Sequence, residues 1–339
     1  MLNKNSFQEV LSICIPTRNR AKKLIDTVWA FHSQIKSHSV RIYISDNSDD
    51  DKTMKLIEEN FGLDNNSVVY MKNGAEFRTY ANNILNLAFK VRGEYIWFFG
   101  DDDLPYENAL DKIFSTLCKS PDFIEVKYVG YNYMLEKILP NSKIVNSNDK
   151  RVDKNYFIQE MIETFSYNGF MSFILFKRKY LLWSLNSKHI DLNSNYILTF
   201  AWYIALLSIP EIKFGISIGL PLVKWREDYG TSPKKLGLAK SRFILNLEHR
   251  NIFSILSKIY NISTLLQSYD GPFQIKIIGK AIGWRRINHL SFSDAIFAVK
   301  NNDDFKLHTK MVIILTSLFP AILLRKLTSN LTMGSFRKE

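Results

Sequence analysis

The sequence predicts an α/β protein with a mostly parallel sheet flanked by helices. A chain of 339 residues is long enough to bury a large core, and 46% hydrophobic and 14% aromatic residues are typical of a folded protein. Over roughly the first 130 residues, short apolar runs also alternate with segments of helical apolar spacing. Such alternation favours parallel pairing, because each helix returns the chain to the end of the sheet where the previous strand began.

The elements of this first part follow one another in regular order. The opening helix, for example, places Leu24, Ile25, Val28 and Phe31 on one face. Strands are predicted at residues 11–15, 40–45, 67–71, 95–99 and 123–133, and helices at 21–36, 52–60, 79–92 and 106–119. Ligands of such sheets bind beyond the carboxyl ends of the strands. Three polar clusters are expected there: Thr17–Arg20, Asp46–Asp51 and Asp101–Asp103.

Helices dominate the predicted structure after residue 150. Helical spacing occurs at residues 155–165, 196–208, 241–260 and 273–282, strands are predicted at 173–176 and 212–218, and a polar loop at 224–235. We therefore predict two regions. Residues 1–235 form the sheet domain, and residues 236–339 form a helical, basic and amphipathic C-terminal region.

Composition excludes several classes of protein. The two cysteines, Cys14 and Cys118, lie in apolar runs, so we expect a reducing compartment and no disulfide framework. Residues 1–10 lack the apolar run of a signal peptide. Uninterrupted apolar stretches of about 18 residues, which a spanning helix needs, are also missing from the sequence.

The acidic triplet Asp101–Asp103 is the first candidate site. It directly follows the apolar run Trp97–Phe99, which would deliver the carboxylates to a fixed edge of the sheet. Adjacent carboxylates repel one another unless a cation or solvent neutralises them, and Mg²⁺ prefers a few carboxylates together with phosphate oxygens. The alternative is an Asp-rich helix cap before Leu104-Pro105.

Asp46, Arg18 and Arg20 are the second set of candidates. Asp46 ends a strand, where its carboxylate can accept from a base N–H or from ribose hydroxyls; alternatively it forms an Asx turn within Asp-Asn-Ser. The two arginines can contact phosphate or stack on a base, or they lie on a solvated loop.

Three motifs together resemble a known family. They are Leu11-Ser-Ile-Cys-Ile-Pro-Thr-Arg-Asn-Arg20, Ile44-Ser-Asp-Asn-Ser-Asp-Asp50 and Trp97-Phe-Phe-Gly-Asp-Asp-Asp-Leu-Pro105. In order and spacing they look like the family 2 glycosyltransferases of the GT-A fold, over residues 10–230. The resemblance implies that Pro16, Thr17, Arg18 and Asp46 contact the nucleotide.

The same resemblance assigns the triplet to the family's DxD motif, which would bind Mn²⁺ or Mg²⁺. The commoner form of the family has an Asp where Gly100 stands here. Asp101 and Asp103 fit DxD literally, whereas alignment on the trailing acidic pair favours Asp102 and Asp103. All three are therefore kept as metal ligands, and Arg20, Asp101 and Asp102 are kept as nucleotide contacts.

Members of this family are usually inverting, so a carboxylate must remove the proton of the acceptor hydroxyl. Asp191 precedes a predicted helix and is one candidate for this general base. Glu227 and Asp228 are the others. The loop that carries them could instead close over the diphosphate through Arg226.

The C-terminal region carries almost all of the net charge. Residues 231–339 hold 17 Lys and Arg against 6 Asp and Glu, a net charge of +11 out of +12. The apolar stretch Met311–Leu324 precedes Arg325-Lys326, a pattern that suits an anionic membrane surface. The alternatives are a subdomain that covers the core or a homo-oligomer contact. Nucleic acid is not expected, because a recognised binding module is missing from the sequence.

These observations predict a bacterial enzyme on the cytoplasmic face of the inner membrane. It would move a sugar from a CDP-, UDP- or GDP-linked donor to a lipid-linked oligosaccharide, in O-antigen or other surface-polysaccharide synthesis. Overall resemblance is greatest to the abequosyltransferases, which add 3,6-dideoxyhexoses. The alternative is a non-catalytic nucleotide-binding or scaffold protein on a degenerate GT-A fold.

Overall fold

The computed structural model describes most of the first 226 residues and parts of the rest. The described residues are 9–35, 38–62, 66–74, 79–139, 142, 144–163, 171–190, 196–226, 255–260, 281, 290, 292–300 and 307–318. The chain divides into two compact units. The first comprises Met1–Met161 and Tyr167–Glu227, and the second comprises Ile162–Ser166 and Asp228–Glu339.

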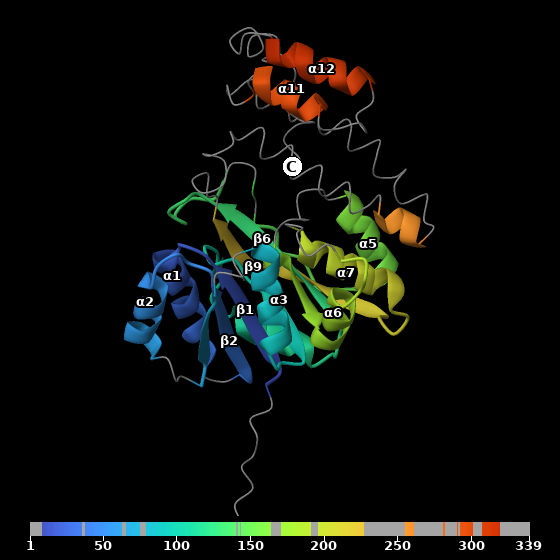
Figure 1. Ribbon diagram of the computed structural model, residues 1–339. Coiled ribbons are helices and arrows are strands. Elements are labelled where there is room, and N and C mark those ends of the chain that lie inside the picture. Colours follow the sequence, from blue (N-terminus) through green and yellow to red (C-terminus); the bar gives the residue numbers. More distant parts are fainter. Residues whose placement is uncertain are drawn as a thin grey trace, which may run out of the picture. The chain divides into compact units, whose positions relative to one another are not determined.

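A mixed, mostly parallel sheet forms the centre of the first unit (Figure 1). In the described part of the chain its nine strands are β1 (Leu11–Thr17), β2 (Val40–Asp46), β3 (Val68–Lys72), β4 (Tyr95–Phe98), β5 (Leu104–Pro105), β6 (Phe123–Tyr131), β7 (Lys150–Asp153), β8 (Ile174–Lys177) and β9 (Phe214–Arg226). Their order is β3-β2-β1-β4-β8-β6-β9-β5, and β7 also pairs with β9.

The longest pairings of this sheet are parallel. Strand β1 pairs in parallel with β2 and β4, β2 with β3, and β6 with β9. Antiparallel pairing is confined to the shorter partners β5, β7 and β8. Because β8 is antiparallel to both β4 and β6, the strands β6 and β9 run in the same direction as β1–β4. Their carboxyl ends therefore reach the same edge of the sheet.

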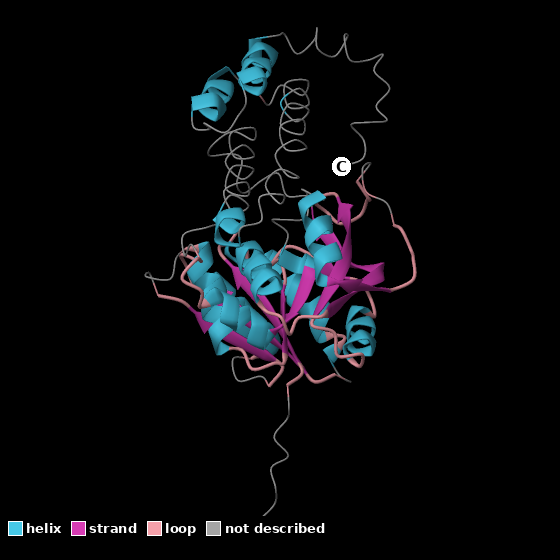
Figure 2. Ribbon diagram, turned by 90° about the vertical axis from the view of Figure 1, so that its right-hand side faces the viewer, coloured by secondary structure: helices cyan, strands magenta, loops and turns pink. Residues whose placement is uncertain are grey.

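Helices lie along both faces of the sheet (Figure 2). They are α1 (Ala21–His32), α2 (Lys52–Phe61), α3 (Tyr80–Lys90), α4 (Ala109–Leu117), α5 (Lys154–Glu163), α6 (Arg178–Leu185) and α7 (Ile197–Ser208). The apolar spacing of α1 explains its packing. Its buried face brings Phe31 edge-on against Trp97 and Phe99, so α1 is anchored beside the acidic triplet.

Strand β9 differs most from the sequence-based prediction. The predicted strand stopped at residue 218 and was followed by a polar loop from 224, but β9 continues to Arg226. Long parallel pairing with β6 explains the difference, because Val129, Gly130 and Tyr131 pair with Lys224, Trp225 and Arg226. The prediction that 224–226 is loop was wrong, and the short strands β5 and β7 were not predicted.

Among the described residues of the second unit, α11 (Phe292–Lys300) and α12 (Leu307–Leu318) contact each other. The predicted helices 241–260 and 273–282 lie mostly outside the described residues, which retain helical residues 255–260 and Ala281. Within the part of the chain that the structure describes, every helix is too short or too polar to cross a membrane.

Candidate active site at the carboxyl edge of the sheet

Parallel pairing brings the predicted polar clusters to one edge. Thr17 ends β1 in register with Asp46 at the end of β2, and Asp46 is in register with Lys72 at the end of β3. Strand β4 lies on the other side of β1 and leads into the acidic triplet. The candidate residues on these strand ends are neighbours because their strands are neighbours.

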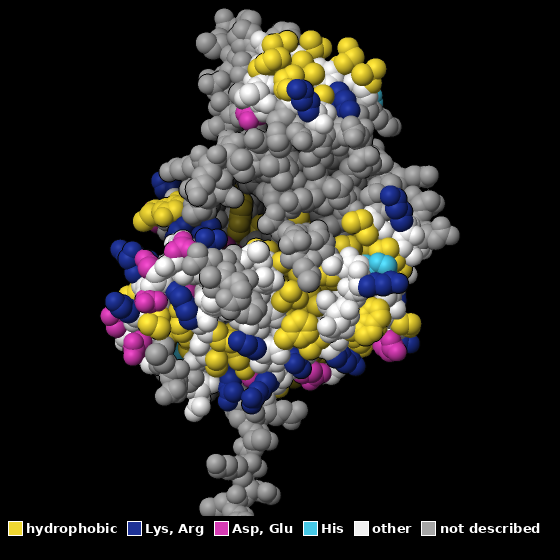
Figure 3. Space-filling model, viewed as in Figure 1, with side chains coloured by type: hydrophobic (Ala, Val, Ile, Leu, Met, Phe, Trp, Pro, Cys, Tyr) yellow, Lys and Arg dark blue, Asp and Glu magenta, His cyan; other side chains and the backbone are white. Residues whose placement is uncertain are grey.

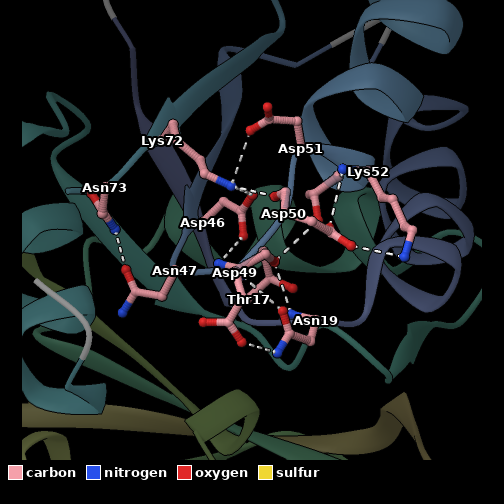
Figure 4. A network of polar contacts seen from close by, with 12 residues as sticks. Thr17, Asn19, Asp46, Asn47, Asp49, Asp50, Asp51, Lys52, Lys72 and Asn73 are labelled. Carbon is pink, nitrogen blue, oxygen red and sulfur yellow. Dashed lines mark hydrogen bonds and ion pairs between the residues drawn. The ribbon is translucent and has the colours of Figure 1, made fainter. Parts of the chain in front are cut away.

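Asp46 is fully buried and holds several hydrogen bonds. Its Oδ1 accepts the backbone N–H of Ser48 at 2.7 Å, while its Oδ2 accepts the hydroxyl of Tyr70 at 2.7 Å and lies 3.5 Å from Lys72 Nζ. Burial of Tyr70, together with its bond to this carboxylate, raises the pKa of the phenol. Figure 4 shows Asp46 directed between Lys72 and the 47–50 loop. The alternative given for Asp46, an Asx turn, is present, and the second oxygen binds side chains from β3.

The loop after β1 is fastened to the loop after β2. Asn19 adopts a positive φ of 57° and donates its backbone N–H to Ser48 Oγ at 2.8 Å. Its side chain exchanges hydrogen bonds with Asp49 through Nδ2 at 2.7 Å and Oδ1 at 3.0 Å. Arg18 also reaches Asp49, at 3.4 Å, and both of these side chains are about half exposed. Asn19 therefore fixes the loop, while Arg18 lies at its solvent side.

Sequence reasoning missed an amide network beside this loop. Asn73 donates through Nδ2 to Ser45 Oγ at 2.7 Å and to Asn47 Oδ1 at 2.6 Å, and its own Oδ1 accepts from Asn86 at 2.5 Å. Asn73 directly follows β3 and precedes Gly74, and it was not among the predicted site residues. Its position was the available signal, because a polar residue at that strand end lies at the same edge as Asp46.

The loop residues also bind the acidic triplet. Thr17 donates its hydroxyl to Asp101 Oδ2 at 2.7 Å, and Arg20 Nη1 lies 2.8 Å from Asp101 Oδ1 and 3.0 Å from Asp102 Oδ2. Burial raises the pKa of Asp101, although Arg20 opposes the shift. The side chain of Asp102 is more exposed, at 16% against 7% for Asp101. Of these two carboxylates, Asp102 is the one that faces outward.

Asp103 points into the protein. Its Oδ1 accepts the backbone N–H of Arg226 at 3.1 Å, and its Oδ2 accepts the hydroxyl of Ser172 at 3.2 Å. The Ser172 oxygen in turn accepts the backbone N–H of Gly100 at 3.0 Å. Burial raises the pKa of Asp103 well above its usual range. Asp103 therefore holds the end of β9 against the turn that follows β4.

Gly100 makes room for this carboxylate. A Cβ atom at Gly100 would lie only 2.5 Å from Asp103 Oδ2, closer than such contacts allow. The commoner family motif has Asp at this position. Here the glycine leaves the space that the inward carboxylate of Asp103 occupies.

Arg226 reaches the triplet from β9. Its Nε donates to the carbonyl oxygen of Asp102 at 2.7 Å, and its Nη1 donates to the carbonyl oxygen of Tyr133 at 2.9 Å. Arg226 was predicted to close over a diphosphate, and the structure places it beside the acidic turn. The predicted general bases Asp191, Glu227 and Asp228 lie outside the described residues.

The donor set of the triplet fits a hard divalent cation that also binds phosphate. Mg²⁺ in such sites usually takes one or two carboxylates, with substrate phosphates and water completing its coordination. Asp102 offers an outward carboxylate of this kind. Within the described residues, groups of three or more His, Cys, Asp and Glu side chains arranged to hold a metal by themselves do not occur.

Comparison with solved structures supports the class of fold. Crystal structures of S. aureus TarS 1-349 match with UDP-GlcNAc bound (TM-score 0.57, 12% identity, 96% of this chain and 92% of that chain) and with UDP bound (TM-score 0.52, 12% identity, 91% and 89%). At this identity the match shows the fold alone, which is GT-A-like. No curated protein matches the chain.

The family follows from the sequence model that matches. The model of Glycosyl transferase family 2 covers residues 12–181, half of the chain. The chain belongs to this family, so it is a glycosyltransferase. The predictions of the family and of the GT-A-like fold are confirmed.

Proposed function

We propose that this protein transfers a sugar from a nucleotide-sugar donor, bound along the carboxyl edge of the sheet, to a glycan acceptor. The observation that carries the proposal is the continuity of that edge. Thr17–Arg20 connects the buried carboxylate of Asp46 on one side with the outward carboxylate of Asp102 on the other. A nucleoside and its diphosphate need these two environments side by side.

The nucleoside end of the donor would bind near Asp46. Because Ser48, Tyr70 and Lys72 already hold this carboxylate, its position is fixed before any ligand arrives. The amides of Asn47 and Asn73, which bond to each other beside it, carry the donor and acceptor atoms that a base requires. Pro16, Thr17 and Arg18 complete the predicted nucleotide contacts.

The diphosphate end would bind at Asp102, with Arg20 and Arg226 beside it. Mn²⁺ or Mg²⁺ held by Asp102 and the donor phosphates would neutralise charge on the departing nucleoside diphosphate. Arg20 can contact the same phosphates, because its guanidinium already spans Asp101 and Asp102. Asp101 and Asp103 are buried and would support the turn, whereas Asp102, the more exposed carboxylate, would supply its open ligand.

The general base of an inverting transfer would come from Glu227 or Asp228, with Asp191 as the other candidate. The chain enters the Glu227-Asp228 pair from Arg226, whose backbone N–H is bonded to Asp103. The base must lie close to the sugar carbon that is attacked.

The acceptor is proposed to be a lipid-linked glycan, reached from the cytoplasmic face of the inner membrane. Helix α12 supports this, because its polar residues Thr309, Thr316 and Ser317 are buried while four apolar side chains are exposed at helical spacing. The exposed side chains are Leu307, Met311, Leu315 and Leu318. Figure 3 shows hydrophobic side chains gathered over α11 and α12, with Lys and Arg beside them.

An apolar helical face in a region of net charge +11 suits an anionic lipid surface. We expect full-length protein to sediment with phosphatidylglycerol-containing vesicles, and Leu315→Asp to weaken this binding. Leu220→Asp, at an exposed apolar position of β9, is the matched control. Equal binding by Leu315→Asp and wild type, or dimerisation that Leu315→Asp abolishes, would assign the face to another role.

A screen of nucleotides tests the donor site. TarS crystallised with UDP-GlcNAc, which makes UDP sugars the first probes, and the resemblance to abequosyltransferases adds CDP-linked 3,6-dideoxyhexoses. CDP, UDP and GDP, free and sugar-linked, would be compared by thermal shift with Mn²⁺, Mg²⁺ or chelator. We expect one base to stabilise the protein in a metal-dependent way and its sugar to be turned over. Nucleotide binding without any turnover would favour the non-catalytic alternative.

A further inference from the structure

The hairpin that follows β6 presents an aromatic ring next to the acidic turn. Strand β6 ends at Tyr131, which forms an isolated bridge with Ile138. The side chain of Tyr133, in the hairpin, is 51% exposed, and that of Met134 is 62% exposed. Exposed aromatic residues are common, so exposure alone assigns nothing. The surroundings of this ring are more informative.

The hairpin is held by several hydrogen bonds. Asn132 donates its N–H to the carbonyl of Lys137 at 2.8 Å, and its side-chain oxygen accepts the N–H groups of Glu136 at 2.9 Å and Lys137 at 3.1 Å. The Tyr131 hydroxyl bonds to that of Tyr106 at 2.9 Å. Tyr133 therefore belongs to a hairpin that hydrogen bonds already hold in place. A ligand that binds its ring loses little free energy to the ordering of this segment.

Two cations lie over the ring of Tyr133. Lys23 Nζ is 4.5 Å from the ring centroid and the guanidinium carbon of Arg226 is 5.9 Å away. Lys23 comes from α1, one turn beyond Arg20, and Arg226 comes from the end of β9. Three separate parts of the chain thus bring an exposed ring and two positive charges together.

This cluster is continuous with the proposed diphosphate site. Arg226 donates to the carbonyl of Tyr133 and to the carbonyl of Asp102, so one side chain joins the hairpin to the acidic turn. The buried carboxylates of Asp101 and Asp103 accept protein donors. Asp102 pairs with Arg20, and its side chain is more exposed than that of Asp101.

We propose that Tyr133, Lys23 and Arg226 form a subsite for a phosphate-linked sugar. The apolar face of a sugar ring packs on an exposed aromatic ring while the sugar hydroxyls stay in water, and lysine and arginine bind phosphate oxygens. The ligand has two sources with this chemistry: the sugar of the nucleotide donor, or an acceptor glycan carried on a lipid diphosphate. The proposal rests on the proposed transferase function and adds its sugar-binding contacts.

Binding measurements on the full-length protein test the subsite. The variants are Tyr133→Ala, Tyr133→Phe and Lys23→Ala, with Tyr156→Ala as a control at another tyrosine that is 53% exposed. The probes are UDP, UDP-GlcNAc and a panel of hexose 1-phosphates, the last measured with and without saturating UDP. We expect Tyr133→Ala to weaken the sugar-bearing probes by about tenfold, as aromatic and cation–π contacts of this kind imply. Tyr133→Phe should keep wild-type affinity, and Lys23→Ala should weaken the phosphate-bearing sugars.

These measurements distinguish the donor sugar from the acceptor glycan as the ligand, and a failed subsite from a failed donor site. A loss confined to UDP-GlcNAc assigns the subsite to the donor sugar, and a loss confined to hexose 1-phosphates in the presence of UDP assigns it to the acceptor. The subsite is overturned if Tyr133→Ala binds every sugar-bearing probe as tightly as wild type does. It is also overturned if wild-type protein binds UDP but its affinity for each sugar-bearing probe is no higher than that of Tyr133→Ala. Wild-type protein that binds no nucleotide at all counts against the donor site itself.

Discussion

Asp46 ends β2 and the acidic turn Asp101–Asp103 follows β4, on the two sides of β1, yet the two sites present their carboxylates differently. Asp46 is fully buried, and both of its oxygens are held by donors from its own loop and from β3. In the acidic turn, two carboxylates bond inward and Asp102 faces outward. A carboxylate held on both oxygens is a fixed acceptor, whereas an outward one can still take a cation.

The difference comes from where the partners of each carboxylate originate. Tyr70 and Lys72 are two residues apart on β3, so they lie on the same face of that strand and reach Asp46 together. The partners of the acidic turn come from distant segments: Arg20 precedes α1, Ser172 precedes β8 and Arg226 ends β9. The acidic turn therefore joins the segment before α1 to the segments before β8 and at the end of β9.

The outward position of Asp102 should make it the more sensitive of the two sites in catalysis. We expect Asp102→Asn to lower metal-dependent transfer about 100-fold or more, as loss of one stabilising group at developing charge typically does. The fold should remain, because the side chain is partly exposed. Asp111→Asn, at a carboxylate with 65% exposure, is the control, measured by turnover and melting temperature. Equal turnover in the two variants would remove Asp102 from the metal site.

The buried position of Asp46 should make it the more sensitive in nucleotide binding. We expect Asp46→Asn to weaken binding of the preferred nucleoside diphosphate about tenfold and to lower stability by about 1–3 kcal/mol, since its amide cannot replace an acceptor facing Tyr70 and Lys72. Asp50→Asn is matched, because this half-exposed carboxylate pairs with Lys52 in the same loop. Calorimetric titration measures the affinity and thermal melts measure the stability. Identical nucleotide affinities of Asp46→Asn and Asp50→Asn would place the nucleobase away from Asp46.

The smallest expected effect concerns the space beside Asp103. A methyl group at Gly100 must displace the Asp103 carboxylate, so Gly100→Ala should cost about 1–2 kcal/mol of stability. The same substitution in an Asp103→Ala background should cost much less, because the obstructing oxygen is gone. Denaturant unfolding of the four proteins gives the coupling energy. Additive effects would show that Gly100 and Asp103 do not share this space.

Local pattern was sufficient for the first half of the sheet and for its polar edge. Apolar runs and helix spacing located β1–β4 with α1–α4, and strand-end positions identified Thr17, Arg20, Asp46 and the triplet. Pattern failed for β9, whose residues 224–226 include Lys224 and Arg226 and form strand through pairing with β6 and β5. It also missed Ser172 and Tyr133, which nothing in their own segments marks as belonging to the edge.

The sequence by itself determined the family, the order of strands and helices, and which acidic residues reach the carboxyl edge, because these depend on short-range periodicity and on motifs within single segments. Only the tertiary structure decided how each carboxylate is used. The burial and the partners of a carboxylate come from segments up to 123 residues away, as in the bond from the Arg226 backbone N–H to the carboxylate of Asp103. Adjacent aspartates of identical chemistry are thereby divided into two that support the turn and one that faces outward.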